Sequence, residues 1–145
     1  MGLKNRLAAR PRPTATYALR IDDDTVPRAE LAAARAAGDE DRIVTAQTAV
    51  EACYEQVTLR ALPPVELEAL IAAHPPPKDQ QGKKMFNSVT FIPALLAASV
   101  ESDVSEEDWV EFYTSGAMTT GEISDLFNTV WDLNYRAPDP NLPKE

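Results

Sequence analysis

The feature that most constrains the fold is an apolar stripe near the end of the chain. In the segment "TTGEISDLFNTVWDLN", residues 119–134, large apolar side chains recur at the i, i+3, i+4, i+7 and i+8 spacing of one helical face. Thr119 and Glu122 have the spacing of a capping box, which predicts that the helix begins there. The segment contains no His, Cys, Lys or Arg. We therefore expect an amphipathic helix that supplies apolar surface and no reactive group.

Helix signals also cover most of the remaining chain. Ser105 and Asp108 form a second capping-box pattern, and Gly116 has the position of a C-terminal cap between the last two helices. The segment 28–55 is rich in strong helix formers and predicts either one long helix or a helical hairpin that turns at Gly38. Two further predicted helices are "VELEALIAAH", which three prolines end, and "FNSVTFIPALLAASV", in which Pro93 is suited to a helix start.

Two short segments have the period-two alternation of half-buried strands. Tyr17, Leu19 and Ile21 alternate with smaller or polar residues, and so do Val57, Leu59 and Ala61. We expect these segments to pair as a two-stranded ribbon. The predicted fold class is therefore α+β, mainly α, with a small helical domain, a short ribbon and disordered termini.

The distribution of prolines and charges indicates how the chain is organised. A chain of 145 residues is long enough for one domain with a core, and its twelve prolines cluster near residues 11–13, 75–77 and 138–143. We expect a flexible basic leader at 1–15, a single helical domain at 16–136 and a proline-rich tail at 137–145. Within the domain, the segment at about 75–85 is expected to be a mobile loop.

The charge balance argues against a DNA-binding function. The formal net charge is -9, whereas affinity for duplex DNA comes largely from Lys and Arg that neutralise phosphates. The leader is the exception, because it is basic, which indicates either a solvated tail or a contact with an acidic partner or RNA. The basic residues of the leader are Lys4, Arg6, Arg10 and Arg12, and the next basic residue of the chain is Arg20. All five precede the first acidic residue.

The sequence also predicts neither a membrane span nor a disulfide. No apolar run approaches the roughly 18 residues that cross a bilayer, and the N-terminus lacks the apolar region of a signal peptide. Cys53 is the single cysteine, so it cannot form a disulfide within the chain. We expect a protein of a reducing cytoplasm that makes no membrane contact.

Reactive groups with the spacing of a known site are not found. The run Asp22, Asp23 and Asp24 invites a metal ion, but consecutive side chains cannot all point at one ion, and a role at a helix start accounts for them. His74 is the single histidine and suits a helix C-terminus, and no flanking signature supports a nucleophilic pair with Cys53. We therefore predict no catalytic residue, no metal site and no cofactor.

The order of these segments resembles a known family. "VTLRALPPVELEALIAAHPP", a hydrophilic loop, "FNSVTFIPALLAASV", an acidic "SEEDW" helix start and "GEISDLFNTVWDLN" follow one another along about residues 16–135. This order resembles the tail assembly chaperones of long-tailed phages and prophages, especially those of actinobacterial hosts. The shared motifs are apolar helices and the "HPP" sequence rather than catalytic signatures.

The resemblance implies a chaperone that binds the tape-measure protein and keeps it soluble during tail-tube assembly. It implies a place in the host cytoplasm, absence from the mature virion, and no enzymatic activity. Further candidate partners are a longer form of this chain, produced by ribosomal frameshifting, and the tail tube protein. Two alternatives stay open: a structural head–tail or tail adaptor retained in the virion, and a small metal-dependent enzyme that uses Asp22 to Asp24.

A holder for a long, apolar, helical partner needs exposed apolar faces and net charge for solubility. The predicted partner-binding residues lie on the last apolar helix and on the uncharged segment before it. They are Phe91, Ile92, Leu95, Leu96, Val100, Ile123, Phe127 and Trp131. The alternative for the same side chains is an ordinary place in the core, because an amphipathic helix usually buries its apolar side in its own domain.

Overall fold

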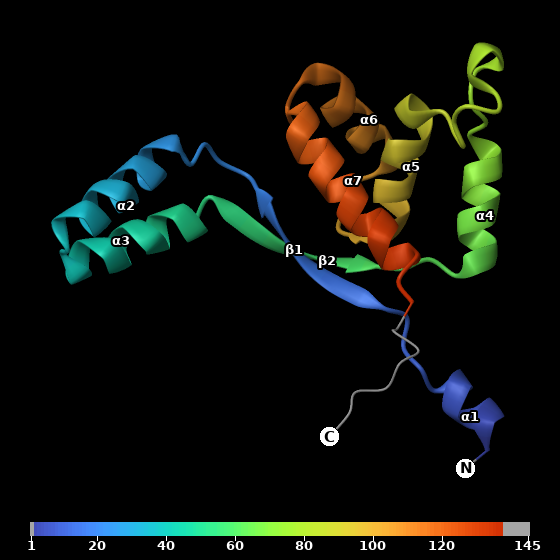
Figure 1. Ribbon diagram of the computed structural model, residues 1–145, viewed down its shortest axis with the longest axis horizontal. Coiled ribbons are helices and arrows are strands. Elements are labelled where there is room, and N and C mark those ends of the chain that lie inside the picture. The colour runs from blue at the N-terminus through green and yellow to red at the C-terminus, as the bar shows by residue number, and fades with distance from the viewer. Residues whose placement is uncertain (1, 138–145) are drawn as a thin grey trace. The chain divides into compact units, whose positions relative to one another are not determined.

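The computed structural model describes residues 2–137 and confirms the predicted α+β, mainly α fold class (Figure 1). The predicted proline-rich tail lies outside the described residues, apart from residue 137. Along the chain the elements are α1 (Leu3–Ala8), β1 (Thr14–Arg20), α2 (Thr25–Ala37), α3 (Glu40–Glu51), β2 (Tyr54–Arg60), α4 (Pro64–Ala73), a 3₁₀ turn η1 (Lys78–Gln80), α5 (Ser88–Ser99), β3 (Val100–Glu101), α6 (Glu106–Ser115) and α7 (Thr120–Asn134). Within residues 2–137, no helix has both the length and the apolar composition that crossing a bilayer requires.

The chain forms two compact units. One consists of residues 16–57, and the other combines residues 2–15 with 58–137. Strands β1 and β2 each continue from one unit into the other. The single domain predicted for residues 16–136 stays a prediction, because cooperative unfolding decides whether two compact units behave as one domain.

The unit of residues 16–57 contains a helical hairpin, which resolves the alternative that the sequence left open. Gly38 ends α2 in the left-handed conformation with φ 67°, where a side chain would be strained. Asp39 then caps α3, because its side chain accepts a hydrogen bond from the Arg42 amide at 3.2 Å. Glu30 on α2 forms an ion pair with Arg42 on α3 at 2.8 Å. The buried residues of the two helices are Leu31, Ala34 and Ala46, one leucine and two alanines.

The sheet has three strands in the order β1-β2-β3, one strand more than the predicted two-stranded ribbon. The added strand β3 pairs antiparallel with β2, with Thr58 opposite Glu101 and Leu59 opposite Val100. Arg60 of β2 also forms an ion pair with Glu101. A strand of two residues is too short to show an alternating pattern, which is why the sequence did not predict it.

In the unit of residues 2–15 and 58–137, helix α5 lies between α4 and α7, and α6 also packs against α5 (Figure 1). Both predicted capping boxes are confirmed: Ser105 with Asp108 at the start of α6, and Thr119 with Glu122 at the start of α7. Gly116 is confirmed as the C-terminal cap of α6, with φ 82°. The largest fully buried residues of this core are Trp109, Phe91, Leu59, Leu95, Leu96, Leu126 and Val130.

Helix α5 begins earlier than the sequence predicted. Asn87 caps it by accepting a hydrogen bond from the Val89 amide at 3.1 Å, so Pro93 lies inside the helix rather than at its start. Proline has no N–H to donate to the carbonyl of Val89 one turn earlier. The helix continues through this position because Pro93 and its neighbours are buried among the surrounding elements.

The segment between α4 and α5 is a closed loop. Three prolines follow α4, the turn η1 comes next, and Gly82 takes a positive φ of 82°. The Asn87 amide then donates to the carbonyl of His74 at 2.9 Å, which joins the two ends of the loop. The mobility predicted for residues 75–85 stays a prediction, because it concerns motion in solution.

Candidate functional site

The structure divides the eight predicted partner-binding residues into buried and half-buried sets. The buried set is Phe91, Leu95, Leu96, Val100 and Ile123, and the half-buried set is Ile92, Phe127 and Trp131. In this conformation the buried side chains offer almost no surface to a partner. The apolar face of α5 is covered by α4, α6 and α7, so the core alternative describes this segment better than an exposed docking face.

The two half-buried aromatic residues belong to a longer row along α7. Phe127, Trp131 and Tyr135 follow one another at one-turn spacing, and Phe86 contacts this row from the segment before α5. The Trp131 ring lies 5.8 Å from Phe127, 4.6 Å from Tyr135 and 5.6 Å from Phe86, measured between ring centroids. We call Phe86, Phe127, Trp131 and Tyr135 the aromatic stripe.

Buried Phe91 packs against three of the four rings of the aromatic stripe and fixes their positions. Its ring centroid lies 4.2 Å from Phe86 and about 6 Å from both Phe127 and Trp131, with edge-to-face geometry for the latter two. Tyr135 at the end of the stripe is 52% exposed. The stripe therefore combines rings that are fixed by packing with apolar surface that reaches solvent.

Sequence reasoning missed Phe86 and Tyr135. Tyr135 continues the spacing of Phe127 and Trp131 by one more turn, so extending the helical pattern past Asn134 could have found it. Phe86 belongs to no periodic segment. Only the return of the loop before α5 toward α7 places its ring against Trp131.

A pocket of about 270 Å³ lies toward the start of α7, beyond the aromatic stripe. Ile92 of α5 and Ile123 of α7 line it, so these two predicted residues belong to the pocket rather than to the stripe. The remaining lining residues are Tyr113, Met118, Thr119, Thr120 and Ser124. The lining is polar and apolar in about equal parts, because the two threonines and the serine stand beside the apolar residues.

The charged residues of helices α5 to α7 are of one sign, whereas Lys84 and Arg136 adjoin the two ends of the stripe in sequence. From Met85 to Tyr135 the sequence contains no Lys, Arg or His, and its acids are Glu101, Asp103, Glu106, Glu107, Asp108, Glu111, Glu122, Asp125 and Asp132. These acids account for the whole formal net charge of -9. The helices α5 to α7 thus form the acidic part of the chain, and the remainder is neutral in sum.

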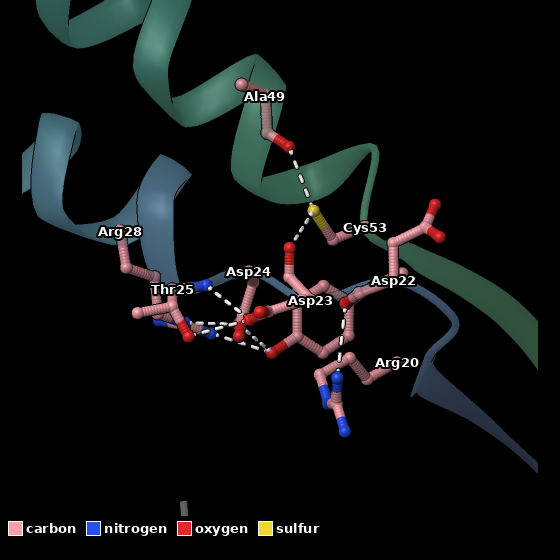
Figure 2. A network of polar contacts seen from close by, with 9 residues as sticks. Arg20, Asp22, Asp23, Asp24, Thr25, Arg28, Ala49 and Cys53 are labelled. Atoms are coloured by element: carbon pink, nitrogen blue, oxygen red, sulfur yellow. Dashed lines mark hydrogen bonds and ion pairs between the residues drawn. The ribbon is translucent and has the colours of Figure 1, made fainter. Parts of the chain in front are cut away.

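The three aspartates after β1 take part in a separate polar network in the unit of residues 16–57 (Figure 2). Asp23 accepts hydrogen bonds from the Thr25 amide at 3.0 Å and from the Thr25 hydroxyl at 2.6 Å. Asp24 accepts one from the Tyr54 hydroxyl at 2.5 Å and forms an ion pair with Arg28. The network ties the first turn of α2 to the start of β2.

These hydrogen bonds change the acidity of two carboxyl groups. The Thr25 hydroxyl lowers the pKa of Asp23 below its ordinary value of 3.8. Hydrogen bonds from Tyr54 and then from Arg28 lower the pKa of Asp24 below the same value. The side chain of Asp22 points away from the network in Figure 2.

Because the folded-state pKa of Asp24 is lowered, its stabilising contribution is present above about pH 4 and is lost as the pH falls through the folded value. We expect the wild-type protein to lose more stability than Asp24→Asn when the pH is lowered from about 5 to about 3. Amide hydrogen exchange in α2 and the urea midpoint at each pH measure this difference. Asp22→Asn is the matched control and should lose as much as the wild type; equal losses in all three proteins would contradict the expectation.

The single cysteine and the single histidine lie in different compact units, and each has a local structural partner. Buried Cys53 donates from its sulfur to the carbonyl oxygen of Ala49 at 3.4 Å, as Figure 2 shows. The His74 ring packs against the edge of Phe91, with 6.2 Å between ring centroids. Packing and local hydrogen bonds therefore account for both side chains.

Across the described part of the chain, no three His, Cys, Asp or Glu side chains gather in a way that could hold a metal ion. Comparisons with protein-family models, with curated proteins and with solved structures find no match to this chain. The candidate site is therefore defined by its geometry alone. It consists of the aromatic stripe and the neighbouring pocket, beside the acidic helices α5 to α7.

Proposed function

We propose that the protein is a tail assembly chaperone of a long-tailed phage or prophage. In this role it binds the tape-measure protein in the host cytoplasm, keeps it soluble while the tail tube assembles, and is absent from the mature virion. The observation that carries the proposal is the aromatic stripe, a row of rings that are fixed by packing and partly open to solvent. The resemblance of the segment order to this family supports it independently.

The stripe suits an elongated helical ligand. Phe127, Trp131 and Tyr135 repeat at one-turn spacing, so the stripe presents an apolar strip along α7 that can pack against the apolar face of another helix. Aromatic side chains bury a large area, and rings already held by neighbours lose little freedom on binding. The rings can therefore bind through shape and apolar area without any catalytic chemistry.

The acidic charge of helices α5 to α7 suits the same role. A protein that holds an apolar partner must keep the complex soluble, and net charge far from zero provides this. The nine acids between residues 85 and 135 have no basic residue among them, so the charge is concentrated on the helices that carry the stripe. In this proposal the longer frameshifted form of the chain would share residues 16–136 and could recruit the tail tube protein through its extension.

The double change Trp131→Ala with Tyr135→Ala is expected to reduce retention of the tape-measure protein by about 30-fold or more, as loss of an aromatic hot spot does. The half-buried Trp131 also contributes to stability, so we expect a loss of about 1–3 kcal/mol on unfolding. Co-expression with the tape-measure gene, followed by pull-down and by measurement of its soluble fraction, tests the first effect. Thermal melting of the purified variant tests the second.

Val65→Ala is the matched control, because Val65 is exposed and apolar but lies on α4, outside the stripe. It should retain the tape-measure protein like the wild type. A folded double variant with undiminished retention would overturn the assignment of the stripe as the binding surface. Mass spectrometry of purified virions tests localisation, and a stoichiometric amount of this chain there would favour the structural adaptor instead.

A further inference from the structure

We propose that α1 of one molecule docks into the pocket between α5, α6 and α7 of a second copy of this chain. The association is head to tail, because the leader of one copy meets the pocket of the next. It does not depend on the proposed function, since it concerns the purified protein without any tail component.

Among the described residues, no element buries the apolar side of helix α1. Leu3 and Leu7 are one turn apart and therefore share a face, yet they are 69% and 51% exposed, and α1 has no buried residue. A helix of six residues is far shorter than the roughly 12–15 residues at which isolated helices become even marginally stable in water. The pattern of two leucines one turn apart is that of an anchor helix that gains stability on docking.

The pocket offers the complementary surface. Ile92, Tyr113, Met118 and Ile123 make about half of its lining apolar, and its volume of about 270 Å³ provides space for leucine side chains. Thr120 stands at the rim and is exposed, so the pocket is open to solvent. An anchor helix with apolar residues at i and i+4 is the ligand such a surface recognises.

Charge complementarity favours the leader of a second copy of this chain as the occupant of the pocket. The leader carries Lys4, Arg6, Arg10 and Arg12 and no acid, whereas residues 85–135, which build the pocket, carry nine acids and no base. Opposite charges concentrated on two apolar surfaces of one sequence favour their mutual contact and raise the association rate at low salt. The sequence itself thus supplies both halves of a complementary interface.

Within one molecule, the leader is anchored near the end of α7 that lies away from the pocket. Arg12 donates to the carbonyl of Ala61 at 2.7 Å, and the next residue, Leu62, donates to the side chain of Asn134 at the far end of α7. The pocket residue Ile123 lies about 16 Å from Asn134 along the helix axis. Only three residues lie between the end of α1 at Ala8 and the anchored Arg12.

Two backbone hydrogen bonds shorten the link between α1 and Arg12. The Ala9 amide donates to Asn5 and the Arg10 amide donates to Leu7, both at 3.1 Å, so the chain continues to curl after α1. In the structure α1 therefore stays near the anchored end, with both leucines open to solvent. A second molecule can bring its pocket to these leucines without stretching the link.

A head-to-tail contact uses two different surfaces, so it can repeat from copy to copy and form rings or filaments. We expect the mass measured by sedimentation velocity or light scattering to rise with protein concentration at about 0.05 M salt and to fall at about 0.5 M salt, where charge attraction is screened. A wild-type protein that stays monomeric at every concentration would overturn the proposal. Protection of α1 from hydrogen exchange in such a monomer would show docking within one molecule instead.

Two variants separate the halves of the interface. Leu3→Asp with Leu7→Asp disables the leader, and Met118→Arg disables the pocket; each alone is expected to be monomeric. If circular dichroism shows that Met118→Arg does not fold, Thr120→Arg at the exposed rim replaces it. Val65→Asp places one negative charge on an exposed apolar residue of α4 and should associate like the wild type.

Mixing the two disabled variants gives the sharpest result. The leader-disabled copy keeps its pocket and the pocket-disabled copy keeps its leader, so the mixture should form a one-to-one dimer and nothing larger. A mixture that stays monomeric, or single variants that still associate, would overturn the proposal. If the leader binds a nucleic acid and takes no part in self-association, the leader-disabled variant should associate to the same extent as the wild type. That result would contradict the proposal.

Discussion

Trp109→Ala is expected to lower the free energy of unfolding by about 3–5 kcal/mol, the range found when a buried large aromatic side chain is removed. Trp109 lies on α6, is 2% exposed, and packs edge to face on Phe112 with 6.0 Å between ring centroids. Its removal leaves a cavity in the core of the unit of residues 58–137, because close-packed neighbours relax only in part. Urea or thermal unfolding of the purified variant measures the loss.

Two variants control this result. Trp109→Phe keeps most of the ring and removes a buried indole N–H for which the described residues provide no hydrogen-bond partner, so it should lose clearly less than Trp109→Ala. Val110→Ala changes the adjacent residue, which is exposed, and should cost about 0.5 kcal/mol or less. If Trp109→Ala costs no more than Val110→Ala, the packing of α6 against the core is wrong.

Phe91→Ala is expected to cause a loss of the same size, about 3–5 kcal/mol. Phe91 is fully buried on α5 and contacts Phe86, Phe127 and Trp131, so its removal takes away the support of the aromatic stripe. Unfolding measurements report the stability, and near-ultraviolet circular dichroism reports the packing of the rings. The variant should lose both stability and the signal of the packed rings.

The same substitution separates the two interpretations that the sequence allowed for Phe91. A core residue costs stability when truncated, whereas a partner-contact residue costs binding and leaves the melting temperature unchanged. Phe91→Leu keeps most of the apolar volume and should lose less than Phe91→Ala, and Val89→Ala on the exposed side of α5 should be nearly neutral. A folded Phe91→Ala with unchanged melting temperature would return Phe91 to the predicted binding surface.

Local structure could be predicted wherever its signal is contained in a few neighbouring residues. The capping boxes at Ser105 and Thr119 and the left-handed cap at Gly116 were all recognisable, because side chain and backbone partners are three residues apart or adjacent. The strand starts were predicted less well: β1 begins at Thr14 and β2 at Tyr54, each three residues before the alternating pattern. At the start of β1 the burial does alternate, but Thr14, Ala15 and Thr16 carry no large apolar side chain that would reveal the period in the sequence.

Positions that depend on distant partners could not be predicted. The short strand β3 exists because β2 pairs with it, and α5 tolerates Pro93 because its neighbours bury the helix. The candidate site also depends in part on residues that are distant in the sequence. The spacing along α7 predicted Phe127 and Trp131, but Phe86 joins them only through the course of the preceding loop.

By itself, the sequence determined the helical character of the chain, the ends of its last two helices, and the separation of a basic leader from an acidic C-terminal part. These properties depend on hydrogen bonds and periodicity within one or two turns, or on a simple sum of charges. Only the tertiary structure decided which apolar faces are buried. Helix α5 and the C-terminal part of α7 are both strongly apolar in sequence. Three neighbouring helices cover α5, whereas Trp131 and Tyr135 of the aromatic stripe remain partly exposed to solvent. The physical reason is that burial is a property of the elements that pack together, and a segment's own residues do not specify its neighbours.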